Sequence, residues 1–126
     1  MKDARRAVKL SASCHCGAVR LELPRRPRTL TSCNCSICRR YGALWAYYRR
    51  STFRVICEPG ATASYAWGAK NIHFVRCRTC GCVTHHERKG SPAHPVGVNA
   101  RNLDPEALGA VRVRHLDGAA TWKYLD

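Results

Sequence analysis

The chain has 126 residues, enough for one domain with a sizeable core, and its nine cysteines are an odd number that excludes a fully paired disulfide framework. Lys and Arg number 22 against 8 Asp and Glu, so the formal net charge is +14, which favours anionic partners. No apolar run approaches the roughly 20 residues of a membrane span, and no secretory signal is evident, so we expect a soluble, cytoplasmic protein with metal-bound thiols.

Segments in which apolar and polar residues alternate recur along the chain, separated by Pro and Gly. Such segments predict short strands, because alternate side chains of a strand point to opposite faces. We predict strands at residues 18–23, 44–48, 52–57, 71–77, 95–99 and 111–114. Helix is scarce: residues 36–42 could form one turn ending at Gly42, and residues 104–109 another with Asp104 as N-cap. The pattern predicts an all-β fold of short antiparallel strands with little helix.

We expect a single domain over residues 10–126, preceded by a charged segment, residues 1–9, that we expect to be frayed. The supply of large apolar side chains is thin, with two Phe, one Met and three Trp. Something besides apolar burial should therefore stabilise the fold, and the clustered cysteines are the natural candidate.

Eight of the nine cysteines lie in three clusters: Cys14 and Cys16; Cys33, Cys35 and Cys38; Cys77, Cys80 and Cys82. Zinc–sulfur bonds of about 2.3 Å in a tetrahedron place sulfurs about 3.8 Å apart. A C-x-C pair on extended chain and a C-x2-C pair on a tight turn can each bring two sulfurs to one ion. One pair cannot close a site, so Cys14 and Cys16 need partners, and Cys77 and Cys80 are the natural ones. This pairing would clamp early strands to late ones.

The remaining cluster, Cys33, Cys35 and Cys38, is one ligand short of a closed tetrahedral site. Three ligands with an exchangeable fourth position are typical of a catalytic zinc. Two alternatives stay open. Cys57, Cys82 or a histidine could complete a structural site, or the two early clusters could pair with each other. Cys57 alternates with apolar neighbours, so we also interpret it as a small buried hydrophobic residue.

Several motifs together resemble the glutathione-dependent formaldehyde-activating enzyme family, whose relatives include the globular domain of centromere protein V. They are "CHCGAV" (14–19), "CNCSICRRYGALWAY" (33–47), "HFVRCRTCGCVTH" (73–85), "GVNARNLDP" (97–105) and "DGAATWKYLD" (117–126). The resemblance implies a β-tent fold with two zinc ions per chain. It implies a structural zinc at Cys14, Cys16, Cys77 and Cys80, and a catalytic zinc at Cys33, Cys35 and Cys38. The family's named activity condenses formaldehyde with glutathione to S-hydroxymethylglutathione, and is classed as a carbon–sulfur lyase.

Residues beside the clusters are candidates for substrate contacts. Arg39 and Arg40 follow the last ligand and could pair with a substrate carboxylate, although a solvated pair is an equal alternative. Asn99 could orient substrate, although closing a turn is the simpler role. His85 or His86 could carry a proton, but a solvent-exposed histidine at a strand end is the favoured interpretation.

Two classes of function remain. The first is a zinc-dependent carbon–sulfur lyase acting on an aldehyde and a small anionic thiol such as glutathione. The second is a non-enzymatic zinc module that binds protein or nucleic acid, with both zinc sites structural. The basic residues are dispersed along the sequence, so we expect nucleic-acid binding to be nonspecific. The ligand count at "CNCSIC" separates the classes, because three ligands with no fourth nearby favour an enzyme.

Overall fold

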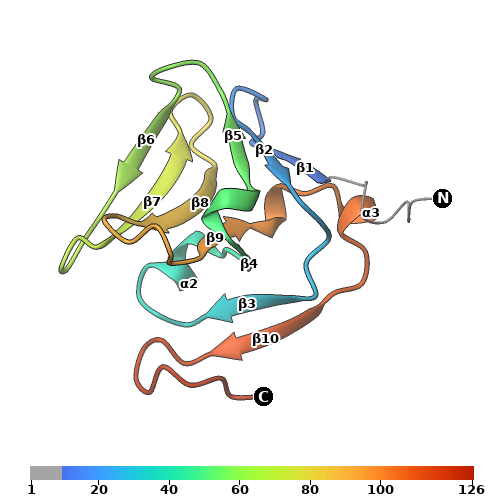
Figure 1. Cartoon of the computed structure of the whole chain (residues 1–126). Helices are drawn as coiled ribbons and strands as arrows, with labels where there is room; N and C mark the ends of the chain where they lie inside the picture. Colours follow the sequence, from blue (N-terminus) through green and yellow to red (C-terminus); the bar gives the residue numbers. More distant parts are fainter. Residues whose placement is uncertain (1–9) are drawn as a thin grey trace.

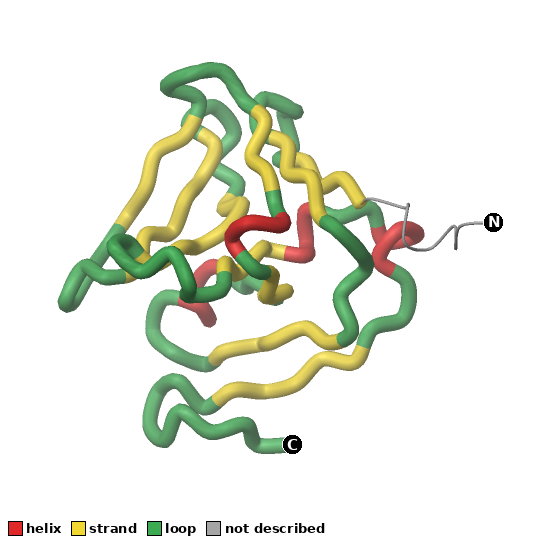
Figure 2. The backbone as a smooth tube through the Cα atoms, viewed as in Figure 1, coloured by secondary structure: helices red, strands yellow, loops and turns green. Residues whose placement is uncertain are grey.

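The computed structural model describes residues 10–126; the segment 1–9, which we expected to be frayed, lies outside the described residues. Strands dominate, and helix is limited to short pieces (Figure 2). The strands are β1 (Leu10–Ser13), β2 (Arg20–Leu23), β3 (Thr29–Cys33), β4 (Trp45–Tyr48), β5 (Arg54–Ile56), β6 (Thr62–Tyr65), β7 (Ile72–Cys77), β8 (Val83–Arg88), β9 (Val96–Asn99) and β10 (Arg112–Leu116). The helical turns are α2 (Cys38–Tyr41), η1 (Arg50–Thr52), η2 (Ala100–Asn102) and α3 (Pro105–Leu108). The mainly β prediction is confirmed.

The strands form two sheets (Figure 1). The smaller has the order β1-β2-β5, and the larger has the order β10-β3-β4-β9-β8-β7-β6. All pairs are antiparallel except one: β10 runs parallel to β3, with Val113 opposite Leu30. The expectation of only antiparallel strands is wrong at this edge. A parallel pair needs a long crossover, and the chain between β3 and β10 includes most of the larger sheet.

The main core lies between the two sheets. Leu21 and Leu23 of β2 face Ala46 and Tyr48 of β4 across it, with valines of β9 beside them. On β4, Trp45 belongs to a second cluster with Phe74, on the opposite side of the larger sheet. This division follows from the period of two in a strand. We keep the single-domain expectation, which a core shared by both sheets supports.

All six predicted strands are present, but β1, β3, β6 and β8 were not predicted. Their sequences are short and rich in small or polar residues, as in "LSAS" and "TASY", so alternation is weak. Both helical turns are confirmed: α2 ends at Gly42 with φ of 64°, and the Asp104 carboxylate accepts a hydrogen bond from the Glu106 N–H at 3.0 Å.

None of the helices within residues 10–126 has the length and apolar character that a membrane span requires.

Candidate metal centres and the adjoining cavity

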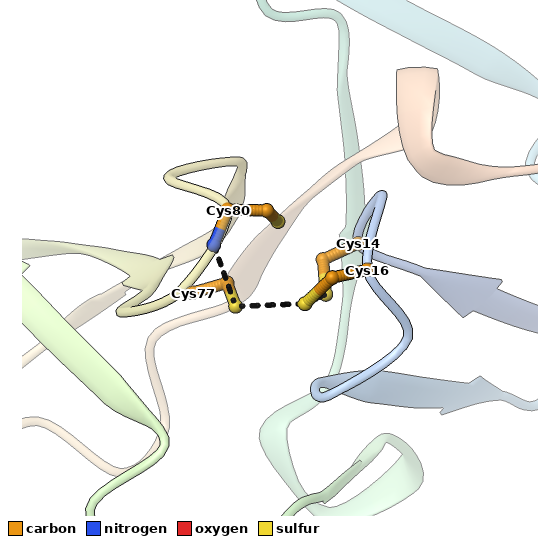
Figure 3. A group of neighbouring side chains, drawn as sticks. All are labelled: Cys14, Cys16, Cys77 and Cys80. Carbon is orange, nitrogen blue, oxygen red and sulfur yellow. Dashed lines mark hydrogen bonds between the residues drawn. The ribbon is translucent and has the colours of Figure 1, made fainter.

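The first cysteine cluster joins two turns that are far apart in sequence. Cys14 and Cys16 follow β1, while Cys77 ends β7 and Cys80 lies on the next turn (Figure 3). Their four sulfurs all lie within 4.8 Å of one another. The Cys16 and Cys77 Sγ atoms are 3.6 Å apart, and those of Cys14 and Cys16 are 3.8 Å apart. These separations match the edges of a zinc–sulfur tetrahedron, about 3.8 Å.

Backbone geometry in both turns directs N–H groups at these sulfurs. The Val19 N–H donates to Cys14 Sγ at 3.3 Å, and the Cys80 N–H donates to Cys77 Sγ at 3.4 Å. Hydrogen bonds from the backbone N–H groups of Cys82 and Cys16 lower the pKa of the Cys80 thiol to about 5. Donors aimed at sulfur favour thiolates, the form in which cysteine binds a metal ion.

The turns themselves depend on glycine. Gly17 has φ of 86° and Gly81 has φ of 82°, in the left-handed region that other residues disfavour. Each glycine directly follows a cluster cysteine, and the Gly81 N–H bonds back to the Cys77 carbonyl at 2.9 Å. The sequence "CHCG" and the sequence "CRTCG" therefore form two matching halves of one four-sulfur site.

The second cluster lies where β3 passes into α2. Cys33 is the last residue of β3 and Cys38 is the first of α2, with Cys35 between them. Their three sulfurs lie within 4.8 Å of one another. The Cys38 N–H donates to Cys35 Sγ, and the buried indole N–H of Trp45 donates to Cys38 Sγ, both at 3.4 Å. Burial raises the pKa of the Cys38 thiol, and Cys35 adds to the rise.

The segment after β10 holds this cluster from one side. Asn34 Nδ2 donates to the Asp117 carboxylate at 3.0 Å, and the Ala119 N–H donates to Asn34 Oδ1 at 2.9 Å. Gly118 is buried, and it lies so close to the cluster that a Cβ there would be 2.5 Å from Cys33 Sγ. Only glycine fits this approach without displacing a sulfur.

No further His, Cys, Asp or Glu joins the three cysteines anywhere in residues 10–126. Cys57, a candidate fourth ligand, is exposed, so our interpretation of it as a buried hydrophobic residue is wrong. It follows β5, a strand at the edge of the smaller sheet. Cys82, the other candidate, packs against Cys14 and Cys77 beside the four-sulfur cluster.

In place of a fourth ligand there is a cavity of about 320 Å³, lined by all three cysteines. One face of the larger sheet forms much of its wall. Trp45 and Tyr47 of β4 line it, as do Ile72 and Phe74 of β7, and His86 and Arg88 of β8. Each pair is spaced by two residues, so the alternation of the strands directs them to the same side. Trp45 is fully buried, whereas Tyr47 is 41% exposed.

His86 lies in an aromatic setting beside the cluster. Its ring centroid is 4.5 Å from that of Trp45, 5.6 Å from Phe74 and 5.8 Å from Tyr47. Gly97, opposite it on β9, makes room: a Cβ there would be 2.2 Å from His86 Nε2. Burial lowers the pKa of His86 to about 4, so the imidazole is neutral at pH 7.

His85 and His86 therefore correct the favoured interpretation of solvent-exposed histidines at a strand end. Both are buried in the middle of β8, with exposures of 3% and 8%. His86 lies among aromatic side chains of β4 and β7, and His85 packs against Phe53 at a ring-centroid distance of 5.4 Å. A sequence of polar residues such as "THHER" gave no signal of this burial.

Comparison with known proteins accords with this geometry. The family model described as glutathione-dependent formaldehyde-activating enzyme matches residues 9–114. The chain belongs to this family. A Rhodobacter sphaeroides protein of known crystal structure is similar to it, with 38% sequence identity and a TM-score of 0.68 over 82% of this chain and 99% of that chain.

The cations that line the cavity of this member of the formaldehyde-activating family differ from those that the sequence analysis singled out. Arg39 and Arg40 are both exposed on α2 and are absent from the cavity lining, and the Arg40 guanidinium donates to the Ser36 carbonyl at 2.8 Å. The lining cations are Lys70 and Arg88 instead. Lys70 lies on the β6–β7 turn and Arg88 ends β8, positions with no motif to mark them in the sequence.

Asn99 has its polar atoms engaged within the fold. Its Oδ1 accepts hydrogen bonds from the backbone N–H groups of Arg101 and Leu44, and its Nδ2 donates to the Val83 carbonyl at 3.0 Å. It caps η2 and ties three segments together. Asn99 is also absent from the cavity lining, so its geometry favours the simpler role of closing a turn.

Proposed function

We propose that this protein is a zinc-dependent carbon–sulfur lyase that joins a small anionic thiol, such as glutathione, to an aldehyde. The observation that carries the proposal is the three-cysteine cluster, which has no fourth ligand within residues 10–126 and lines a cavity. A binding module with two structural sites would need a closed second site. The four-cysteine cluster has the composition of a structural zinc site, and we assign it that role.

Cys33, Cys35 and Cys38 would hold the second zinc ion. Thiolate sulfur is a soft donor that suits zinc. The Trp45 indole N–H points at Cys38 Sγ, and the Cys38 backbone N–H points at Cys35 Sγ. A zinc ion bound there would supply positive charge that stabilises a substrate thiolate or polarises a carbonyl group.

The cavity residues would bind and orient the two reactants. Lys70 and Arg88 are the lining cations, and either could pair with a carboxylate of the thiol while its sulfur lies at the cysteine cluster. The net charge of +14 favours the approach of such an anion. Arg39 and Arg40, exposed nearby, would contribute to this field without contacting the substrate.

His86 is the proton-handling group of the cavity in this proposal. As a neutral imidazole it has one N–H donor and one acceptor. Sulfur attack on a carbonyl forms the C–S bond and transfers the π electrons to oxygen, which takes up the proton released by the thiol. The imidazole N–H can hydrogen-bond the oxygen as this charge develops.

The test is acceleration of adduct formation over the uncatalysed reaction, measured by ¹³C exchange spectroscopy with labelled formaldehyde and glutathione. We expect wild-type protein to accelerate exchange and Cys35→Ser to lose at least about 100-fold, since even groups that only support metal ligands cost 10–100-fold. Cys57→Ser is the matched control, because Cys57 is exposed and outside both clusters, and it should behave as wild type. No acceleration by zinc-loaded wild-type protein, with formaldehyde or with a larger aldehyde, would contradict the proposal.

A further inference from the structure

The cavity is far larger than formaldehyde requires. Formaldehyde has two heavy atoms, and a water molecule, which has one, occupies about 30 Å³ in the liquid. The cavity of about 320 Å³ falls in the range, about 300–1,000 Å³, of pockets that enclose much larger ligands. Space remains after the reacting sulfur and carbonyl are placed at the cysteines.

The walls of that space are apolar. Beyond the cysteines, the lining is dominated by Ile37, Trp45, Trp67, Ile72, Phe74, Leu116 and Trp122. The peptide bonds and carboxylates of glutathione would lose hydrogen bonds to water against such walls. They suit the edge of the cavity, where the exposed side chains of Lys70 and Arg88 lie. The apolar part of the cavity is left for the aldehyde.

Two indoles line the cavity although they remain open to solvent. Trp67 on the β6–β7 connection is 48% exposed, and Trp122 after β10 is 66% exposed. They come from segments more than 50 residues apart in sequence, so the shared location is a product of the fold. Exposed aromatic rings around one cavity mark a surface that an apolar ligand can cover.

Trp122 is also held in an unfavourable backbone conformation. Its φ is 61°, in the left-handed region that disfavours residues other than glycine. Its N–H donates to the Asp117 carbonyl at 2.7 Å, and the Asp117 carboxylate accepts a hydrogen bond from Thr121 Oγ1 at 2.9 Å. The surrounding turn therefore fixes the indole beside the cysteine cluster. A Cβ built on Gly118 would lie 2.5 Å from Cys33 Sγ and 3.4 Å from Trp122 Cζ3, so the indole and that sulfur flank the same glycine. Strain of this kind is found where a fixed side chain serves a ligand.

We infer that the aldehyde substrate carries an aromatic or branched aliphatic body, which packs against Trp67 and Trp122, and that formaldehyde is not the preferred substrate. This inference rests on the proposed thiol–aldehyde reaction. The reaction is balanced without an oxidant: the thiol sulfur bonds to the carbonyl carbon, the C=O π pair moves to oxygen, and the thiol proton ends on that oxygen. The product is a thiohemiacetal.

The experiment compares aldehydes with glutathione as the fixed thiol and zinc-loaded full-length protein. Phenylacetaldehyde carries an apolar body, glycolaldehyde is a small polar aldehyde, and formaldehyde has no body. We expect kcat/KM for phenylacetaldehyde to exceed that for each of the others by about 30-fold or more, because burying an aromatic side chain contributes about that factor. Trp67→Ala and Trp122→Ala should each lower the phenylacetaldehyde-to-formaldehyde ratio about 10-fold, and Trp122→Phe should restore most of it.

Tyr65→Ala is the matched control, because Tyr65 is an aromatic residue 47% exposed on β6 that does not line the cavity. Its ratio should equal that of wild type. If Trp67→Ala and Tyr65→Ala change the phenylacetaldehyde-to-formaldehyde ratio of kcat/KM by the same factor, the inference is overturned. So would a formaldehyde kcat/KM equal to or above that of phenylacetaldehyde, and that result would leave the proposed function intact.

A second measurement does not depend on catalysis. The alcohol 2-phenylethanol has the same body without the carbonyl group, and its binding can be followed by tryptophan fluorescence. We expect saturable binding that Trp122→Ala weakens about 10-fold. If no aldehyde is accelerated yet 2-phenylethanol binds in this way, the proposed reaction fails and the apolar ligand class of the cavity is retained. Absence of binding to folded wild-type protein would overturn the inference.

Discussion

The two cysteine clusters of this protein use the same ligand type in opposite ways. The four-cysteine cluster joins two glycine turns, and its four sulfurs, enough for a tetrahedral site, lie within 4.8 Å of one another. The three-cysteine cluster has three, and its remaining side lines a cavity with aromatic walls. In the proposed function, the four-cysteine cluster is a closed site and the three-cysteine cluster is open to a ligand.

The supporting residues differ in the same way. Around the four-cysteine cluster, the packed neighbours are small, namely Val19, Ala61 and Cys82. Around the three-cysteine cluster they are large, with Trp45, Phe74 and Tyr41 among them. Small neighbours let two turns approach each other, whereas large side chains on strands spaced by the sheet leave a shaped space between them. Loss of the first cluster should therefore cost stability, and loss of the second should cost function.

The largest effect expected is from Cys77→Ser. Cys77 is fully buried, with an exposure of 0%, and its sulfur is 3.6 Å from that of Cys16 on the other turn. Because structural zinc contributes about 10–16 kcal/mol of binding free energy in small domains, losing one ligand should lower the free energy of unfolding by about 4 kcal/mol or more. Thermal and urea unfolding with metal analysis would measure this.

Cys35→Ser is the matched comparison for that experiment. It should give a folded protein with one metal ion per chain and a free energy of unfolding within about 2 kcal/mol of wild type, since the four-cysteine cluster is intact. Equal destabilisation by the two substitutions would mean that both clusters are structural, and it would favour the binding-module alternative.

A smaller effect is expected from acid, and it concerns the cavity side. Burial lowers the pKa of His86 to about 4, below its ordinary value of 6.5, so the unfolded chain binds the proton more readily. The stability that depends on neutral His86 is complete above pH 6.5 and is lost as the pH falls toward 4. In this interval, wild type should lose up to about 1.4 kcal/mol per pH unit more than His86→Phe, which keeps an aromatic ring in place.

Urea unfolding at pH 7, 6 and 5, with metal content determined at each pH, would measure the difference. Protonation of cysteine ligands affects both proteins alike, so the difference in slope reports on His86. If the free energy of unfolding falls with pH at the same slope in both proteins, His86 has the same pKa in the folded and the unfolded chain. That result would contradict a buried, neutral His86 imidazole.

The smallest effect is expected from Gly118→Ala. The backbone at Gly118 lies outside the left-handed region, so alanine adds only a methyl group, which would be 2.5 Å from Cys33 Sγ. Displacing that sulfur should weaken metal binding at the three-cysteine cluster about 10-fold and cost about 1–2 kcal/mol of stability. Competition with a chromophoric chelator would show one weakened site and one unchanged site.

Ala119→Ser serves as the control, because Ala119 is the exposed next residue. It should leave both metal affinities unchanged. A Gly118→Ala protein that binds both ions as tightly as wild type would show that the segment after β10 does not hold the cluster in place.

The sequence by itself determined the partition of the cysteines and much of the strand pattern. Metal ligands are recognisable from local spacing, because a C-x-C or C-x2-C turn brings sulfurs together whatever the rest of the chain does. Cys14 and Cys16 lie beside Cys77 and Cys80, the partners that the sequence analysis favoured, and the alternative that pairs the two early clusters is not what the structure shows. The turn at residues 36–42 and the cap at Asp104 are equally local, and both are present.

The cavity was decided only by tertiary structure. Trp67, His86 and Trp122 come from a connection, a strand and the segment after β10, and no local signal links them. The burial of His85 and His86 on β8 depends on aromatic side chains that distant segments bring to them, such as Phe53 and Trp45. Arg39 and Arg40, close to the cysteines in sequence, are not part of the lining. They lie one and two places after the buried Cys38, and with 3.6 residues per turn these positions point away from its face of the helix. The spacing of cysteines along the chain identifies candidate metal ligands. The order of the strands, and which residues of each strand point to the same face, decide which side chains surround those ligands.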